Sequence, residues 1–342
     1  MSLPIRYPYP PMEAETADTI PEGPGWLYEP KWDGFRSLVF RDGDEVRIQS
    51  KAGKPLERYF PDVVAAVRAV PATRFVLDGE IVIPVDGRLS FDELLLRVHP
   101  AESRVRTRAE AHPARLMAFD LLADERGRTL VDLPLAKRRP RLEAFGKKFL
   151  GRGSRVALSK ATMSRATAER WLAGGGDGDL DGILAKRLDL PYRSGARDGM
   201  VKVKRRKTAD CVVGGFRYAS RGGTVGSLLL GLYDDEGILH HVGFTSSIPA
   251  RLRPALTEKL ERLVEPPGFT GRAPGGPSRW STDRSAEWKP LRPELVAEVA
   301  FDHVSGGRFR HGTKFLRWRP DKPPAQCTMD QLTGTASDTA RT

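Results

Sequence analysis

A lysine within residues 29–36 is the first candidate for chemistry. Lys31 lies between apolar, strand-forming residues, and Asp33 and Gly34 follow it closely. Only a deprotonated lysine amine is a nucleophile, and desolvation together with nearby cations lowers the pKa of that amine. The pattern Lys-x-Asp-Gly is therefore compatible with a covalent nucleophile, although a solvated lysine in a hairpin would give the same pattern.

Acidic residues inside apolar strands are the second feature. Asp78 and Glu80 interrupt the apolar run of residues 77–82, where acids almost never lie unpaired. Residues 181–186, Asp-Gly-Ile-Leu-Ala-Lys, repeat this arrangement. Carboxylates placed in this way can bind Mg²⁺ or ribose hydroxyls, whereas a turn or a surface salt bridge is the alternative.

Two lysines alternate with valines in residues 201–204. Because side chains in a strand alternate between its faces, Lys202 and Lys204 are expected on one face. They would be fixed cations for a phosphate, unless they guard an exposed strand edge. A nucleophilic lysine, two acids and two fixed cations are together the components of nucleotidyl transfer through a lysine–nucleotide intermediate.

The composition limits the class of the protein and its partners. Of the 342 residues, 56 are Lys or Arg and 44 are Asp or Glu, which gives a net charge of +12. This excess favours a polyanionic partner, usually nucleic acid, over a general solubility charge. Two cysteines exclude a four-thiolate zinc site and suit a reducing cytosol. We expect no membrane partner, because no run of about 18 apolar residues occurs.

The elements that must position these residues follow from hydrophobic periodicity. Residues 1–24 are rich in proline and acids and are expected to form an N-terminal arm lying on the surface. After the arm, strands are predicted at 35–40, 45–48, 74–84, 116–122, 181–187 and 200–204, and helices at 61–70 and 164–172. Strands and helices do not alternate regularly, which favours an α+β domain of antiparallel sheets over a doubly wound parallel sheet.

A change in the order of the predicted elements marks a second domain. Five basic residues crowd into positions 202–207, which indicates a hinge or a nucleic-acid groove and a boundary after Arg206. Beyond it, strands are predicted at 211–218, 227–233, 238–243, 295–301 and 314–318, with a helix at 250–263. This pattern is typical of a small closed all-β barrel of the OB type. The predicted organisation is an arm at 1–24, a catalytic domain at 25–206, a barrel at 207–330 and a disordered tail at 331–342.

In this order, the segments resemble those of the covalent nucleotidyltransferases, which include ATP-dependent DNA ligases, RNA ligases and mRNA capping enzymes. Residues 20–332 are most similar to the compact, stand-alone C-type ATP-dependent DNA ligases of actinobacteria. The resemblance implies an adenylyltransferase domain followed by an OB-fold barrel. It also implies sealing of 5′-phosphate/3′-hydroxyl nicks through lysyl-AMP and DNA-adenylate intermediates in DNA repair and recombination. ATP is the implied substrate, Mg²⁺ or Mn²⁺ the metal, and nicked double-stranded DNA the partner.

The resemblance also implies roles for individual residues. Lys31 matches the lysine that is adenylated. The nucleotide-binding positions are Glu29 and Phe119 at adenine, Arg36 and Glu80 at the ribose, and Lys202 and Lys204 at the α-phosphate. Glu80 and Asp181 match the metal-binding acids, and Asp181 stands where the family usually has Glu.

Further basic residues are expected at the leaving group and at the DNA. Residues 317–322 resemble the sixth motif of the family, in which Arg319, Asp321 and Lys322 would close over ATP and neutralise the departing pyrophosphate. The expected DNA contacts are Lys51, which replaces the usual Arg of its motif, Arg205, Arg206 and Lys207. Eight basic residues within 137–155, opposed only by Glu143, are expected to track phosphates or to form a solvated helix face.

Two other functions fit parts of this pattern. An RNA ligase or a capping guanylyltransferase shares the lysine chemistry. A non-catalytic OB-type nucleic-acid binder needs only basic and aromatic surface, so the complete set of lysines and acids counts against it. An NAD-dependent ligase is excluded by the missing four-cysteine zinc site. We therefore expect a monomeric, bacterial, cytoplasmic and nucleoid-associated DNA ligase, whose repair pathway and protein partners the sequence does not identify.

Overall fold

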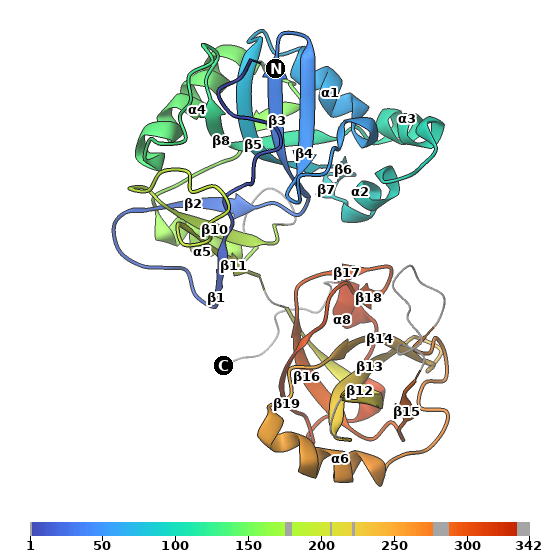
Figure 1. The fold of residues 1–342 in the computed structure, drawn as a ribbon. Coiled ribbons are helices and arrows are strands. Elements are labelled where there is room, and N and C mark those ends of the chain that lie inside the picture. The colour runs from blue at the N-terminus through green and yellow to red at the C-terminus, as the bar shows by residue number, and fades with distance from the viewer. Residues whose placement is uncertain (1, 175–179, 206, 221–222, 276–286, 334–342) are drawn as a thin grey trace. The chain divides into compact units, whose positions relative to one another are not determined.

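The computed structural model describes residues 2–174, 180–205, 207–220, 223–275 and 287–333. The chain forms two compact units, Met1–Arg205 and Arg206–Thr342, so the division falls one residue before the predicted boundary (Figure 1). Within the described ranges, no helix is long and apolar enough to span a membrane.

The first unit contains two main sheets. The larger has the order β4-β3-β5-β8-β9 and consists of β3 (Phe35–Asp42), β4 (Glu45–Ser50), β5 (Arg74–Val82), β8 (Arg115–Ala123) and β9 (Val156–Leu158). The smaller has the order β1-β11-β10-β2 and consists of β1 (Glu15–Ala17), β2 (Trp26–Lys31), β10 (Gly182–Arg187) and β11 (Met200–Lys204). Only β8–β9 and β1–β11 pair in parallel. The predicted α+β domain of mainly antiparallel sheets is confirmed.

Helices cover the larger sheet and enclose its core. They are α1 (Pro61–Arg68), α2 (Phe91–Arg97), α3 (Glu102–Ala111) and α4 (Leu135–Phe149), whereas α5 (Arg165–Leu172) packs against β2 and β10 of the smaller sheet. The helices α1 and α5 were predicted, and the Ser164 hydroxyl caps α5 by accepting a hydrogen bond from the Thr167 N–H. In the unpredicted α4, Leu142 and Phe145 pack into the core although Pro140 interrupts the helical pattern.

The N-terminal arm lies on the first unit and is anchored to it by single buried residues. Ile5, Met12 and Ile20 are all buried, with exposed fractions of 5–7%. Strand β1 within the arm pairs with β11, and Thr16 stands opposite Lys202 in that register. Because these residues are anchored one at a time, the arm shows no regular apolar period.

A glycine at the start of β10 permits the close packing of the smaller sheet. Gly182 has a φ of +147°, and a Cβ atom there would lie 2.1 Å from the Val203 carbonyl oxygen. Both the backbone conformation and the lack of space therefore require glycine.

Gly182→Ala should lower the free energy of unfolding by roughly 2–5 kcal/mol, because it adds a backbone strain and a backbone clash. Urea unfolding of the full chain measures this loss. Gly151→Ala is the matched control, since a Cβ atom there meets nothing within 4 Å. An equal loss in the two variants would contradict the steric explanation.

The second unit is built around one antiparallel sheet. Its order is β14-β13-β12-β16-β19, and β15 also pairs with β12. The strands are β12 (Lys207–Tyr218), β13 (Val225–Tyr233), β14 (Leu239–Thr245), β15 (Lys289–Pro290), β16 (Val296–Phe301) and β19 (Lys314–Trp318). The remaining elements are α6 (Arg253–Glu261), α8 (Asp330–Thr333) and the hairpin β17 (Val304–Ser305) and β18 (Arg308–Phe309).

The predicted strands are present, but their ladders do not close into a complete barrel within the described residues. A single isolated bridge between Thr245 and Thr313 links the end of β14 to the residue before β19. The closed barrel is therefore corrected to an open sheet whose edge strands meet at one point.

The first residues of the predicted C-terminal tail belong to a helix. Gln331 belongs to α8, and its side-chain amide exchanges two hydrogen bonds with the Asp210 backbone, at 2.9 and 3.1 Å. Residues 331–333 are thus part of the second unit, and the rest of the predicted tail, 334–342, lies outside the described residues.

Candidate active site

One face of the smaller sheet brings together the lysines that the sequence singled out. Gly182 stands between Lys31 and Lys204 in the register of β2, β10 and β11. In the next row on the same face, Leu184 stands between Glu29 and Lys202. Directly opposed residues of neighbouring strands point to the same side of a sheet. The sheet register therefore places the predicted nucleophile and both predicted phosphate lysines on one surface.

Lys31 is held by Asp181, the residue that directly precedes β10, which is the neighbour of β2 in the sheet. Its Nζ atom forms an ion pair with Asp181 Oδ2, and the Asp181 N–H donates to the Lys31 carbonyl at 2.9 Å. The Lys31 side chain is 21% exposed and that of Asp181 only 3%. The amine is thus accessible from one side while a buried carboxylate orients it.

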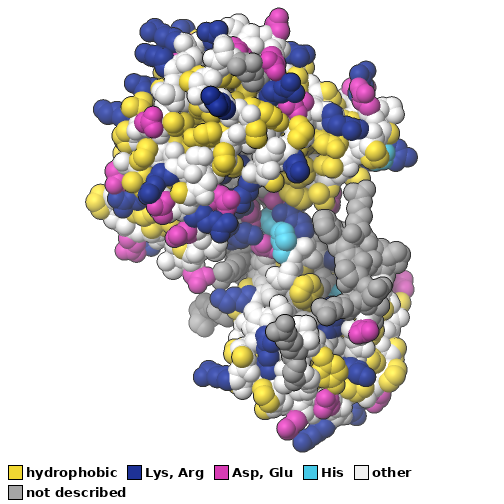
Figure 2. Space-filling view, in the orientation of Figure 1, with side chains coloured by type: hydrophobic (Ala, Val, Ile, Leu, Met, Phe, Trp, Pro, Cys, Tyr) yellow, Lys and Arg dark blue, Asp and Glu magenta, His cyan; other side chains and the backbone are white. Residues whose placement is uncertain are grey.

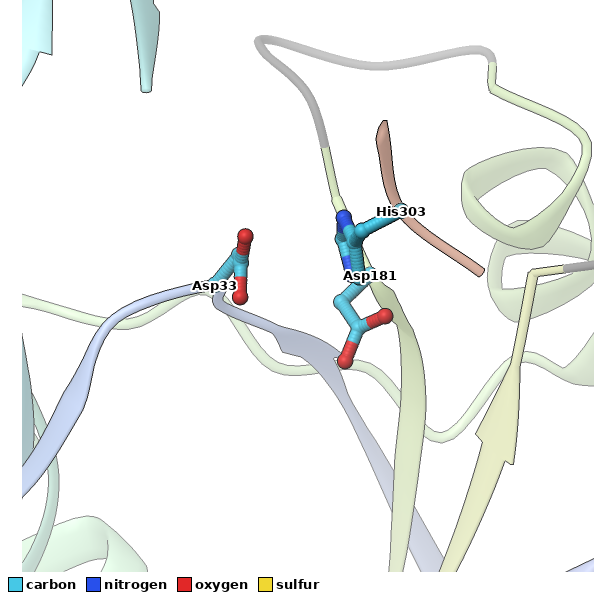
Figure 3. Close-up of side chains that lie close together, drawn as sticks. All are labelled: Asp33, Asp181 and His303. Carbon is cyan, nitrogen blue, oxygen red and sulfur yellow. The ribbon is translucent and has the colours of Figure 1, made fainter. Parts of the chain in front are cut away.

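Asp33 brings a second carboxylate to the same place. Its oxygen lies within 4.8 Å of one from Asp181, and the two acids come from the end of β2 and the start of β10 (Figure 3). His303, which Figure 3 also labels, belongs to the second unit and is not counted in this site. Sequence reasoning did not assign Asp33 a role, although it stands within the Lys-x-Asp-Gly motif itself.

Glu80 is the third acid of the site. Burial raises its pKa to about 8, against the opposing effect of the Arg36 and Lys31 charges, and Asp33 adds to the increase. The charges of Lys31 and Asp33 thus both act on this carboxyl. Mg²⁺ takes oxygen ligands, and it favours a carboxyl that has lost its proton. Asp33 and Asp181 supply two such carboxylates within 4.8 Å of each other, whereas Glu80 is not among the ligand atoms that lie this close together.

The raised pKa of Glu80 predicts a pH-dependent stability. Between pH 4.5, the ordinary value, and about pH 8, the unfolded carboxyl has released a proton that the folded one retains. Compared with Glu80→Gln, the wild-type protein should therefore lose free energy of unfolding as the pH rises through this interval. Urea unfolding at several pH values in EDTA measures the difference. A difference that does not change with pH would contradict the assignment.

Arg36 is fixed by a buried network. Its Nε and Nη2 atoms donate to the two carboxylate oxygens of Asp78, each at 2.7 Å. The Tyr192 hydroxyl donates to Asp78 at 2.6 Å and accepts from the Met12 N–H at 3.0 Å. Burial acts to lower the pKa of Arg36, but the Asp78 charge outweighs it and the pKa is raised. Arg36 is therefore a permanent, oriented cation. Sequence reasoning did not identify Tyr192 and Met12 as parts of this network.

Phe119 and Glu29 share one cation, Lys186. Phe119 is buried, and the Arg36 guanidinium and the Lys186 ammonium lie 4.8 and 4.4 Å from its ring centre. Lys186 also lies 2.6 Å from the fully buried Glu29 carboxylate, which Arg139 contacts at 3.3 Å. The predicted adenine contacts therefore belong to one charged cluster. Lys186 ends the motif that Asp181 begins, but no local pattern pointed to Arg139.

The positive charges of several other residues act on Lys202. Burial lowers its pKa, and the charges of Lys51, Lys204, Lys31 and Arg197 lower it further, in that order. Lys51 itself is exposed and forms an ion pair with Glu13 at 2.9 Å. Fixed, mutually repelling ammonium groups of this kind favour the approach of a phosphate.

The expected DNA-binding cluster at 137–155 is only partly exposed. Arg138 and Arg139 are buried, with exposed fractions of 2% and 8%, and pair with Asp120 and Glu29. These two arginines are therefore structural and unavailable to DNA, which corrects the prediction. The exposed members are Lys137, Arg141, Lys147, Lys148, Arg152 and Arg155. On the visible face of the first unit, basic side chains are interspersed with acidic and apolar ones (Figure 2).

The other expected DNA contacts differ in accessibility. Arg205 is half-buried, and its N–H donates to the Asp181 carbonyl at 3.0 Å. Lys207 is exposed at the start of β12. Arg206 lies outside the described residues.

The predicted leaving-group residues of the second unit converge on one acid. Arg319 contacts both oxygens of Asp210 at 2.9 Å, and Lys322 Nζ contacts one of them at 2.9 Å. Arg319 also donates to Asp321 and lowers the pKa of that carboxyl to about 2. Asp210, which the sequence did not identify, thus orients two of the three predicted residues.

Comparisons with known proteins agree with this geometry. Residues 11–204 match the ATP dependent DNA ligase domain, and residues 221–322 match the ATP dependent DNA ligase C terminal region. DNA ligase C1 of Mycolicibacterium smegmatis is 46% identical over 343 residues, which cover 97% of this chain and 96% of that protein. DNA ligase C of Mycobacterium tuberculosis is 42% identical over 353 residues, with the same coverage.

Solved structures support the fold. Pmar-Lig_PreS3 has a TM-score of 0.59 at 17% identity and covers 86% of this chain and 64% of that chain. A Lig E DNA ligase has a TM-score of 0.54 at 15% identity and covers 91% of this chain and 99% of that chain. The two units correspond to a nucleotidyltransferase domain and a C-terminal OB-fold domain. The chain therefore belongs to the family of ATP-dependent DNA ligases, and its relatives include the C-type enzymes of mycobacteria.

Proposed function

We propose that this ligase seals 5′-phosphate/3′-hydroxyl nicks in duplex DNA by three phosphoryl transfers, with Lys31 as the nucleophile. The observation that carries the proposal is the shared face on which Lys31, Lys202 and Lys204 stand, with Asp181 bound to the Lys31 amine. A nucleophile, an oriented carboxylate and fixed cations for a phosphate are the groups that such a transfer requires.

In the first transfer, Lys31 Nζ attacks the α-phosphorus of ATP. The nitrogen–phosphorus bond forms while the bond to the pyrophosphate oxygen breaks. The ammonium must first lose a proton, and Asp181 Oδ2 is the acceptor in contact with it. Lys202 and Lys204 offset the charge that grows on the phosphate oxygens. The lysyl-AMP that results retains the adenosine in the cluster around Phe119, Glu29 and Arg36.

The next two transfers use the same phosphate-binding face. An oxygen of the DNA 5′-phosphate attacks the AMP phosphorus and releases the Lys31 amine. The 3′-hydroxyl then attacks the 5′-phosphorus, forms the phosphodiester and releases AMP. When bound by Asp33 and Asp181, Mg²⁺ would supply further neutralisation of phosphate charge. We propose that this activity serves DNA repair and recombination in the bacterial cytoplasm and that the enzyme acts as a monomer.

Intact-mass measurement of the full chain after incubation with ATP and Mg²⁺ tests the class of reaction. A covalent AMP adduct is expected with ATP, and the adenylated protein should then seal a nicked DNA duplex. Parallel incubations with GTP and with RNA ends distinguish a DNA ligase from a capping guanylyltransferase and from an RNA ligase. A GMP adduct in place of AMP would indicate a capping-type enzyme. Nucleic-acid binding without any covalent adduct would indicate that the protein is a non-catalytic nucleic-acid binder.

A further inference from the structure

A buried hydroxyl group lies behind the arginine that is expected at the ribose. Tyr192 belongs to the loop between β10 and β11 and is 6% exposed, and its hydroxyl donates to Asp78 Oδ2 at 2.6 Å. The same oxygen accepts a hydrogen bond from Arg36 Nη2 at 2.7 Å. Burial raises the pKa of Tyr192 well above its ordinary value, so the hydroxyl keeps its proton and remains a donor. Tyr192 therefore fixes the carboxylate to which Arg36 is bound.

The Arg36 guanidinium is only partly used by these contacts. Its Nε donates to Asp78 Oδ1 at 2.7 Å, while Nη2 donates both to Asp78 Oδ2 and to the Met12 carbonyl, at 2.7 and 3.1 Å. Within the described residues these bonds occupy the hydrogens of Nε and Nη2, and the two N–H groups of Nη1 remain as donors. Because the guanidinium is planar, its bonds to both carboxylate oxygens also fix the direction in which Nη1 points.

Arg36 has little freedom to turn inward. The buried ring of Phe119 lies 4.8 Å from its guanidinium. The cavity beside Arg36, Asp78 and Tyr192 has a volume of about 10 Å³, which is no more than one water molecule needs. The Arg36 side chain is still 17% exposed, so its open direction leads away from this network. In the register of β3 and β5 it stands opposite Glu80, so the two expected ribose contacts point to the same side of the larger sheet.

We propose that Tyr192 is a positioning residue for the nucleotide, which fixes Asp78 and thereby the direction in which Arg36 presents Nη1 to a hydroxyl of the ATP ribose. The inference rests on the proposed function and adds to it the origin of a preference for a ribonucleotide. Tyr192 acts through Arg36 and not on the substrate itself. A hydrogen bond depends on direction as well as on distance. Loosening Asp78 therefore weakens the contact to the ribose and leaves the contacts to the phosphates unchanged.

Tyr192→Phe removes the hydroxyl and keeps the ring, which lies 5.7 Å from the Arg138 guanidinium. The ATP concentration that gives half-maximal adenylation of the full chain should rise about 3- to 10-fold, the range that the loss of one hydrogen bond produces. The maximal rate of adenylation should change less. The probes for the ribose are 2′-deoxyATP and 3′-deoxyATP, each measured by intact mass in single turnovers. The analogue that lacks the hydroxyl bound by Arg36 should be affected least, so its disadvantage against ATP should shrink.

Tyr9→Phe is the matched control. The Tyr9 ring stacks on that of Tyr192, with ring centres 6.3 Å apart, but the hydroxyl that binds Asp78 is that of Tyr192. This control should keep the half-saturating ATP concentration and both analogue ratios of the wild type. Arg36→Lys lacks the fork of N–H donors. In that background Tyr192→Phe should cause no further change in the ratios, because the residue through which Tyr192 acts has been replaced.

Asp78→Asn covers the case in which Tyr192→Phe fails to fold. It keeps Tyr192 but removes the charged group that links the hydroxyl to Arg36. The ratio for the same analogue should therefore fall, and by more than in Tyr192→Phe.

The inference is overturned if Tyr192→Phe, or Asp78→Asn in its place, retains the wild-type ratios for both analogues. Weaker ATP binding with unchanged ratios would mean that the network only supports the fold. A wild-type protein that forms the AMP adduct but reacts equally well with all three nucleotides would also overturn it, because no ribose hydroxyl would then be recognised. That result would leave the proposed function standing. Absence of any adduct in the wild type would instead overturn the proposed function, and the role of Tyr192 with it.

Discussion

Lys31→Ala should abolish the AMP adduct, with a loss of at least about three orders of magnitude in the rate of adenylation. The reaction makes a nitrogen–phosphorus bond, and alanine offers no amine to form it. Lys202 and Lys204 stand on the same face but on β11, two strands away from β2 in the sheet. They are placed to contact the phosphate rather than to replace the nucleophile. Intact-mass measurement after incubation with ATP and Mg²⁺ gives the result directly.

The same change leaves a buried acid without its lysine partner, so stability must be measured alongside. Asp181 is 3% exposed in its side chain, and removing one partner of a buried pair destabilises a fold. The double variant Lys31→Ala/Asp181→Asn restores charge balance and should still form no adduct. Lys54→Ala removes an exposed lysine of the same unit and should react normally. An adduct of undiminished yield on Lys31→Ala would refute the assignment.

Lys322→Ala should slow lysyl-AMP formation from ATP by about 10²- to 10³-fold, the loss typical of one removed electrostatic stabiliser. Pyrophosphate leaves only in that first transfer. The same variant should therefore seal a nick that already carries AMP on its 5′-phosphate at close to the normal rate. The fold should tolerate the change, because Arg319 still contacts both oxygens of Asp210. Asp321→Ala, which removes the other partner of Arg319, should show the same separation of steps.

Lys202→Ala provides the contrast, because its expected partner is the transferred phosphate, which is present in every step. It should slow both adenylation and the sealing of pre-adenylated nicks. Lys314→Ala removes an exposed lysine of the second unit and should affect neither. Single-turnover sealing of pre-adenylated nicks decides between the roles. If Lys322→Ala loses sealing as severely as adenylation, the segment binds DNA or supports the fold, and its stepwise role is wrong.

Features that depend on neighbouring residues could be predicted from the sequence. Local periodicity predicted strands at 35–40 and 45–48, which form the hairpin of β3 and β4, and the helix at 164–172, which is α5. The two-residue period of a strand placed Lys202 and Lys204 on one face. The family and the order of the two domains were predicted correctly in this way, because both were encoded in short motifs and in their succession along the chain, and the same motifs predict Lys31 as the nucleophile.

Pairings between distant residues could not be predicted in the same way. The acid that holds Lys31 lies 150 positions away, and the partners of Glu29 come from α4 and β10. Arg138 and Arg139 stand in a highly basic segment that is expected to be exposed, yet the fold places a buried acid against each of them. Their burial therefore depends on how α4 packs rather than on their own neighbours in sequence.

Sequence alone determined which groups this ligase has for chemistry, since residue type and strand period are local properties. Tertiary structure decided which of those groups meet. Strand register sets Lys31, Gly182 and Lys204 in one row, and the packing of the N-terminal arm brings Glu13 to Lys51 and Arg197. The physical reason is that register and packing are fixed by the burial of side chains across the whole unit, and local periodicity carries no information about the partner strand.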